Sequence, residues 1–151
     1  MQSIEVQAIV RRSEPGRPRV TVGKFSDFVA ANQVLLDREF GCRIFPGSLN
    51  LYVATPASLQ LDLDRRLYAP TILIRRDMLT AMAPYLGDAQ AWRAKLVGAK
   101  IPGGVDCWVF RRVGSRVPTG IIEIIACEGL SNAYELRNDD PVLLRIWFGG
   151  N

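Results

Sequence analysis

The residues of this chain best suited to chemistry are two small oxygen-bearing side chains that follow a tight turn. Ser48 and Asn50 come directly after Phe45-Pro46-Gly47 and are two positions apart. In a strand they would share one face, while Leu49 and Leu51 face the other way. The pattern predicts either a site where the glycine lets backbone amides approach a ligand closely, or an ordinary turn at the mouth of a hairpin.

A carboxylate within an apolar run is the second candidate. Glu123 lies inside Ile121–Ala126 and has two isoleucines on each side. An unpaired carboxylate is expensive to bury, so we expect it to reach solvent, a cation or a ligand donor. The alternative is a glutamate on the exposed face of an edge strand.

The residue types that are missing limit the possible chemistry. The chain has no histidine, which removes Ser-His-Asp and Cys-His catalysis and leaves a carboxylate, a lysine or a less usual group as general base. Cys42, Cys107 and Cys127 lack CxxC spacing. We therefore expect no zinc site, and reduced, mostly buried thiols.

Composition indicates a globular protein with a basic surface. The 151 residues are 48% hydrophobic, which suits one domain over residues 1–151. The net charge is +4, and Arg11, Arg12, Arg17 and Arg19 cluster near the start. This suits an anionic partner such as nucleotide phosphates or nucleic acid, although a solvated surface is the commoner explanation. Without a secretory signal or a long apolar run, we expect a cytoplasmic protein that does not contact membranes.

Short strands are the elements expected to position these residues. Apolar alternation and apolar runs predict them, and helical spacing predicts one clear helix that Ser26 caps and Gly41 ends. Together they predict a mainly β, barrel-like domain with helical insertions. The predicted strands are 4–10, 19–22, 48–53, 71–74, 95–101, 105–113, 120–126 and 142–148.

Shorter helices and turns fill the intervals. Asp77 is expected to cap a helix that continues through Met82 and Tyr85, and a helical turn or short helix is expected at 88–94. Pro102-Gly103-Gly104 predicts a turn and residues 128–136 a helical turn. Asn138 to Pro141 predicts another turn, in which Asp139 and Asp140 bond the local backbone and have no catalytic role. Residues 54–66 are expected to form a loop.

Two segments together resemble a known family. Phe45–Leu51 and Ile121–Ala126 resemble the signature stretches P-x-G-T-L-N and I-E-I-I-A-P of the archaeal CTP-dependent riboflavin kinases, and they occur in the same order. The resemblance implies a six-stranded cradle-loop barrel. It also implies transfer of a phosphoryl group from CTP to the ribityl 5′-hydroxyl of riboflavin, which makes FMN.

The resemblance also implies roles for individual residues. Ser48, in place of the family's threonine, and Asn50 would hold Mg²⁺, which completes its shell with water and substrate phosphates. Ser115 and Glu123 would contact the flavin, and Glu123 is the nearest candidate for a catalytic base. Nucleotide contacts would fall on Glu128, Gly129, Leu130 and Ser131.

The loop after the first strand departs from that family. Its glycine-rich phosphate loop corresponds here to Arg12–Pro18, which keeps Gly16 but contains two prolines, and prolines donate no amide. The charges of Arg12 or Arg17 would have to replace the missing amides. A non-catalytic flavin- or nucleotide-binding domain on the same barrel is therefore the alternative. Nucleic-acid binding ranks third, because no recognition helix or stacking motif is evident.

Overall fold

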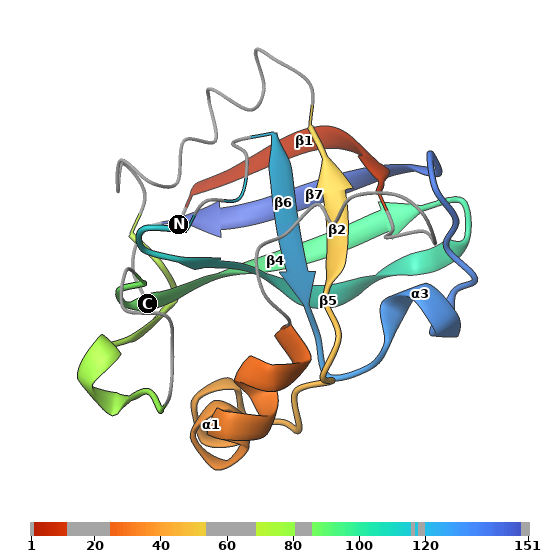
Figure 1. Ribbon diagram of the computed structural model, residues 1–151. Coiled ribbons are helices and arrows are strands. Elements are labelled where there is room, and N and C mark those ends of the chain that lie inside the picture. The colour runs from red at the N-terminus through yellow and green to blue at the C-terminus, as the bar shows by residue number, and fades with distance from the viewer. Residues whose placement is uncertain are drawn as a thin grey trace.

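Six strands close into an antiparallel barrel, and a seventh extends one side of it (Figure 1). The computed structural model describes residues 2–11, 25–53, 69–80, 86–115, 117 and 120–148. The strands are β1 (Gln2–Val10), β2 (Leu49–Tyr52), β3 (Ile72–Ile74), β4 (Ala89–Gly98), β5 (Ile101–Arg112), β6 (Ile121–Ile125) and β7 (Pro141–Phe148). The helices are α1 (Phe25–Phe40), the 3-10 turn η2 (Arg76–Met78) and α3 (Leu130–Ala133).

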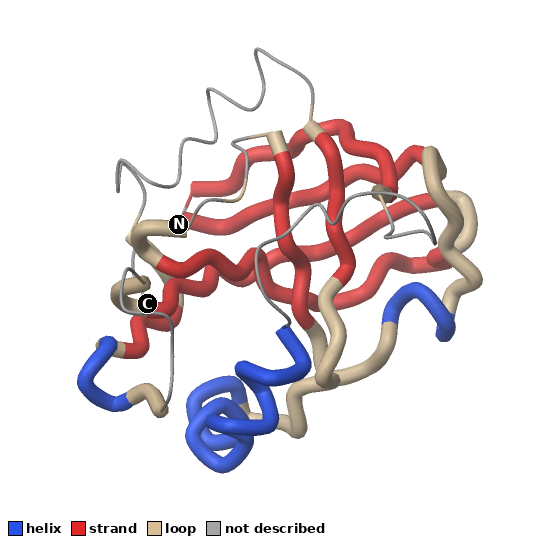
Figure 2. Tube along the Cα trace, viewed as in Figure 1, coloured by secondary structure: helices blue, strands red, loops and turns tan. Residues whose placement is uncertain are grey.

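Strand pairing closes the ring in the order β1, β2, β6, β5, β4, β7 and back to β1. The start of β4 also pairs with β3, over Ala89–Ala91, and its later part pairs with β7, over Ala94–Val97. In Figure 2, β2 and β6 cross in front of β1, β7 and β4, and α1 lies beneath the lower ends of β2 and β6. The expectation of a mainly β barrel with helical insertions is confirmed.

Two apolar clusters hold this arrangement together. Alternate residues of the strands fill the barrel, where Trp92 and Leu144 are completely buried. A second cluster lies between α1 and the outside of β4, β5 and β6, and includes Phe28, Phe110 and Ile125. As predicted, β6 is therefore buried on both faces. Because it pairs with both β2 and β5, the alternative that Glu123 lies on an edge strand is wrong.

Helix α1 ends where the sequence predicted. Gly41 has φ +74°, a left-handed conformation that glycine adopts easily, and its N–H bonds the carbonyl of Asp37 at 2.9 Å. The helix already includes Phe25, so Ser26 is not its N-cap. Asn32 interrupts the helical dihedrals, and its side-chain oxygen accepts from the Thr80 N–H at 2.8 Å. None of the described helices is long and apolar enough to cross a membrane.

The segment between residues 76 and 104 differs most from the prediction. Residues 89–94 belong to β4, because pairing with neighbouring strands overrides the helical propensity of their alanines. Asp77 lies inside the η2 turn and bonds Arg75 at 3.0 Å, so it caps no helix. The β4–β5 hairpin turns between Gly98 and Ile101, while Gly103 and Gly104, both with φ +75°, form an irregularity within β5. The predicted strand at 19–22, the loop at 54–66, and Met82 and Tyr85 lie outside the described residues.

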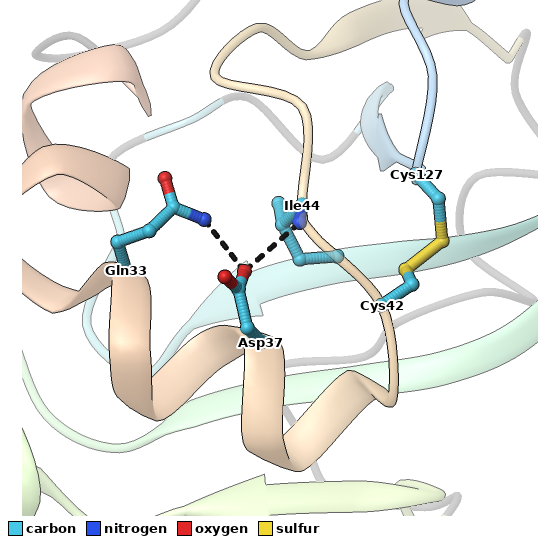
Figure 3. The surroundings of a disulfide bond; sticks show 5 residues. All are labelled: Gln33, Asp37, Cys42, Ile44 and Cys127. Carbon is cyan, nitrogen blue, oxygen red and sulfur yellow. Dashed lines mark hydrogen bonds between the residues drawn. A yellow bond between two sulfur atoms is a disulfide. The ribbon is translucent and has the colours of Figure 1, made fainter.

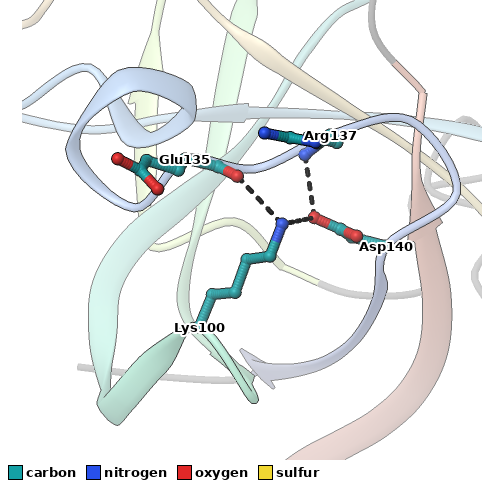
Figure 4. Close-up of polar contacts among 4 residues, drawn as sticks. All are labelled: Lys100, Glu135, Arg137 and Asp140. Carbon is teal, nitrogen blue, oxygen red and sulfur yellow. Dashed lines mark hydrogen bonds and ion pairs between the residues drawn. The ribbon is translucent and has the colours of Figure 1, made fainter.

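The turn before β7 has the predicted chemistry. Asp140 accepts the Arg137 N–H at 2.8 Å, and Lys100 reaches across from the β4–β5 hairpin to the same carboxylate oxygen at 2.7 Å (Figure 4). Asp139 has φ +68°, a conformation that Asp tolerates better than most residues. The helical turn predicted within 128–136 is α3.

Candidate functional site

Adjacent strands bring Ser48, Asn50 and Glu123 together. Asn50 of β2 lies directly opposite Glu123 of β6 in the antiparallel register, so their side chains project from the same face. The Ser48 hydroxyl donates a hydrogen bond to the Glu123 carboxylate. The two segments that the sequence singled out separately therefore meet on one side of the barrel wall.

Glu123 is half-buried on β6, between β2 and β5. Removal from water raises the pKa of its carboxyl, while the Ser48 hydrogen bond and the positive charge of Arg111 lower it in part. Arg111 belongs to β5 and also donates to the Val117 carbonyl at 3.1 Å. Sequence reasoning missed this arginine, since its nearness to Glu123 depends on the register that places Phe110 opposite Glu123.

An unsatisfied oxygen lies beside this carboxylate. Asn50 is 8% exposed, and its side-chain Oδ1 finds no hydrogen-bond partner among the described residues. A buried carbonyl oxygen without a partner is costly unless a ligand supplies one. The Ser48 hydroxyl donates its hydrogen to Glu123, so its lone pairs are available to a cation. The oxygen set of Ser48, Asn50 and Glu123 therefore fits Mg²⁺, a hard cation that takes few protein ligands and keeps several waters.

The described part of the chain contains no cage of three or more cysteine, aspartate or glutamate side chains that could hold a metal ion. Among the described side chains, a cation beside Asn50 would meet the neutral oxygens of Ser48 and Asn50 and the Glu123 carboxylate. This kind of site is completed by ligand phosphates.

The start of the predicted phosphate loop is bonded to this site. The backbone N–H of Arg11 donates to the backbone carbonyl of Asn50 at 2.8 Å. The Arg11 guanidinium lies over the Tyr52 ring, 5.4 Å from its centroid. The chain therefore leaves β1 directly beside Asn50. Arg12, Gly16 and Arg17, the predicted nucleotide contacts of this loop, lie outside the described residues.

A small pocket of about 60 Å³, here called the end pocket, adjoins Ser48. Phe45, Gly47 and Ser48 line one side and residues 128–132 line the other. The predicted nucleotide contacts Glu128, Gly129, Leu130 and Ser131 all belong to this lining. Phe45, for which the sequence predicts a place before the turn but no role in a site, forms part of the wall.

Ser115, unlike Ser48 and residues 128–131, does not line the end pocket. It follows the end of β5, and its hydroxyl accepts the Val117 N–H at 3.2 Å. This loop precedes β6, whereas the end pocket adjoins the residues that follow β6. Arg111 connects the Ser115 loop to Glu123. Its side chain donates to the Val117 carbonyl in that loop, and its positive charge lowers the pKa of the Glu123 carboxyl.

Two of the cysteines form a disulfide beside the end pocket. Cys42 and Cys127 are bonded with a Cα–Cα distance of 6.0 Å, although 85 positions separate them (Figure 3). The expectation of reduced thiols is therefore wrong for this pair, because the fold brings together residues that spacing alone does not relate. Cys107 is a free, buried thiol, as expected, and burial together with nearby Asp106 raises its pKa to about 12.

Comparison with models of known protein families gives no match, and comparison with curated proteins gives none either. The function proposed below therefore rests on the site and on the resemblance of its two segments, Phe45–Leu51 and Ile121–Ala126, to the signature stretches quoted above.

Proposed function

We propose that this chain is a Mg²⁺-dependent phosphotransferase of the riboflavin kinase type, which transfers the terminal phosphoryl group of CTP to the ribityl hydroxyl of riboflavin. The observation that carries the proposal is the buried Asn50 Oδ1, which has no hydrogen-bond partner in the part of the chain that the structure describes, beside the Ser48–Glu123 hydrogen bond. A cation at these oxygens would satisfy Asn50 and offset the cost of burying the Glu123 charge.

Each part of the site has a role in this proposal. Ser48 and Asn50 hold the cation, which when bound neutralises phosphate charge during transfer. Residues 128–131 contact the nucleotide along the end pocket. Glu123 orients the acceptor hydroxyl and accepts its proton, and Ser115 contacts the flavin from the loop after β5. Such catalysis consists mostly of positioning and charge neutralisation.

The direct test offers riboflavin and Mg²⁺ with each nucleoside triphosphate in turn and measures FMN by chromatography. We expect FMN with CTP and little with the other nucleotides. If FMN forms with none of them, the kinase proposal is overturned.

The cation ligands can be tested separately by replacing Ser48 and Asn50 with alanine together. Activity should fall by more than about 100-fold, since even residues that merely support metal ligands contribute 10- to 100-fold. Mn²⁺ binding, followed by electron paramagnetic resonance, should be lost in parallel. Tyr52→Phe is the matched control, because this exposed tyrosine lies on the same face of β2. Unchanged turnover in the double variant would refute the metal assignment.

A non-catalytic flavin- or nucleotide-binding domain is the second candidate. The two prolines of Arg12–Pro18 favour it, because they reduce the number of backbone amides available to phosphate. Native mass spectrometry of freshly purified protein distinguishes the two. Retained flavin without FMN synthesis would support the binding domain, whereas turnover would support the kinase.

A further inference from the structure

Two chain segments form opposite walls of the end pocket. The first wall is residues 42–48, between α1 and β2, and the second wall is residues 126–132, which follow β6 and include the start of α3. Ser48, the last residue of the first wall, also bonds Glu123. The separation of the walls therefore affects both the pocket and the position of a candidate cation ligand.

Three contacts join the walls. The Phe45 N–H donates to the Ala126 carbonyl at 2.9 Å, the Phe45 ring packs against Gly129, and the disulfide links Cys42 to Cys127. The first two are noncovalent, and Phe45 is 39% exposed. The disulfide is therefore the strongest connection between the walls.

The disulfide is accessible to a reductant. Cys127 is exposed and Cys42 is half-buried, so the disulfide lies near the surface, where we expect a thiolate to attack it without unfolding of the barrel. Neither cysteine belongs to the strands of the closed ring. Breaking the bond therefore leaves the pairing of β1, β2, β6, β5, β4 and β7 intact.

We propose that the Cys42–Cys127 disulfide is a redox-responsive clamp that holds the two walls of the end pocket together. A dithiol reductant attacks Cys127 Sγ with one thiolate, forms a mixed disulfide and releases the Cys42 thiolate, which takes up a proton. The second thiol of the reductant resolves the mixed disulfide. The protein gains two electrons and two protons, and the reductant becomes a cyclic or protein disulfide.

Reduction loosens the first wall and with it Ser48. The consequence for ligand binding rests on the proposed function: the oxidised chain binds Mg²⁺ and nucleotide more tightly than the reduced chain, because its pocket is already organised.

The clamp is tested without any ligand by hydrogen–deuterium exchange of the oxidised protein and of the same protein reduced with dithiothreitol. Amide exchange in residues 42–48 and 126–132 should accelerate at least 10-fold on reduction, while exchange in β1 and β7 stays the same. Cys42→Ser should behave like the reduced protein. Cys107→Ser is the control and should keep the slow exchange of the oxidised form, because Cys107 is not in the disulfide.

Several results would overturn the clamp. They are a bond that resists millimolar dithiothreitol in the folded state, unchanged exchange in the walls after reduction, or acceleration spread evenly over the barrel. Chemical reduction leaves the sequence unchanged, so the test does not depend on the folding of a variant.

Titration of Mg²⁺ and CTP into both redox forms separates the clamp from the function. Binding at least 10-fold tighter in the oxidised form supports the full proposal. Equal binding in both forms overturns control of the site by the disulfide. Loosened walls with no binding in either form leave the clamp standing and count against the proposed function.

Discussion

At Glu123, burial makes the ionised carboxyl costly in the folded protein. Its neighbours Ser48 and Arg111 offset this cost in part, yet the net effect is a raised pKa. The Glu123 carboxyl therefore holds its proton more readily than a glutamate in water does. A cation that arrives nearby would favour the ionised form, which is the form that can bind the cation or accept a proton.

The raised pKa predicts how stability depends on pH. As pH rises above the ordinary value of 4.5, the unfolded chain releases the Glu123 proton while the folded chain retains it. The free energy of unfolding therefore falls with pH until the folded carboxyl ionises too. Glu123→Gln should remove this fall, so the variant gains stability relative to wild type across the window and keeps the gain above it. Urea unfolding at several pH values, without divalent cations, measures the effect.

Glu135→Gln is the matched control for this experiment, since the Glu135 side chain is exposed and lies outside the site. It should leave the pH profile as in wild type. A parallel decline of stability in wild type and Glu123→Gln would contradict the assigned cause.

At the scale of elements, the connection from α1 to the first wall depends on one carboxylate. Asp37 Oδ1 accepts the Ile44 N–H at 3.1 Å and the Gln33 side-chain amide at 2.6 Å (Figure 3). Asp37→Ala leaves the N–H of buried Ile44 without this acceptor, which costs about 1–3 kcal/mol. The gain in helix propensity, at most about 0.7 kcal/mol, does not offset the loss. Denaturant unfolding should show the net decrease.

Asp37→Asn keeps an oxygen at the same position, so it should retain most of the wild-type stability. If alanine and asparagine destabilise equally, the hydrogen bond to Ile44 is not the cause.

The close packing of Gly129 against Phe45 gives a second prediction. A Cβ on Gly129 would lie 2.7 Å from Phe45 Cζ, so Gly129→Ala must displace the ring and change the end pocket. The backbone at Gly129, with φ −77°, accepts alanine, so the expected cost is about 1 kcal/mol, at the low end for overpacking, because the half-exposed ring can move. The free energy of nucleotide binding should weaken by more than the free energy of unfolding does.

A double-mutant cycle with Phe45→Ala identifies the cause. In that background Gly129→Ala should be nearly neutral in both stability and binding. An equal effect with and without the Phe45 ring would argue against steric displacement.

The same elements show what the sequence could and could not predict. Apolar alternation was sufficient for β1, and the isoleucines of β6 revealed a strand buried on both faces. Residues 89–94 were misassigned because their alanines favour a helix, and long-range pairing decides their conformation. Pairs such as Cys42–Cys127 and Arg111–Glu123 depend on register and chain path, which local patterns do not encode.

At the scale of the whole molecule, β4 joins most of the structure. It pairs with β3, β5 and β7. Its hairpin with β5 also makes hydrogen bonds to the turn before β7. Lys100 makes this connection by donating to Asp140 at 2.7 Å and to the Glu135 carbonyl at 3.0 Å (Figure 4). The turn before β7 is also joined to β1, since the Val10 N–H donates to the Asp140 carbonyl at 2.9 Å. One turn thus connects β1, β7 and the β4–β5 hairpin.

The charge of Asp140 should make this connection sensitive to acid. The Lys100 hydrogen bond, helped by the Arg137 N–H, lowers the pKa of the Asp140 carboxyl below its ordinary value of 3.8. The resulting stabilisation is present above that value and is lost as pH falls through the lowered pKa of the folded state. Asp140→Asn should therefore be less stable than wild type at neutral pH, and the difference should shrink on acidification.

Asp139→Asn is the control, because the Arg11–Asp139 pair, at 3.8 Å with Asp139 73% exposed, contributes little. Thermal unfolding from neutral to acidic pH measures all three proteins, and a difference for Asp140→Asn that does not change with pH would show that the lost contact is not electrostatic.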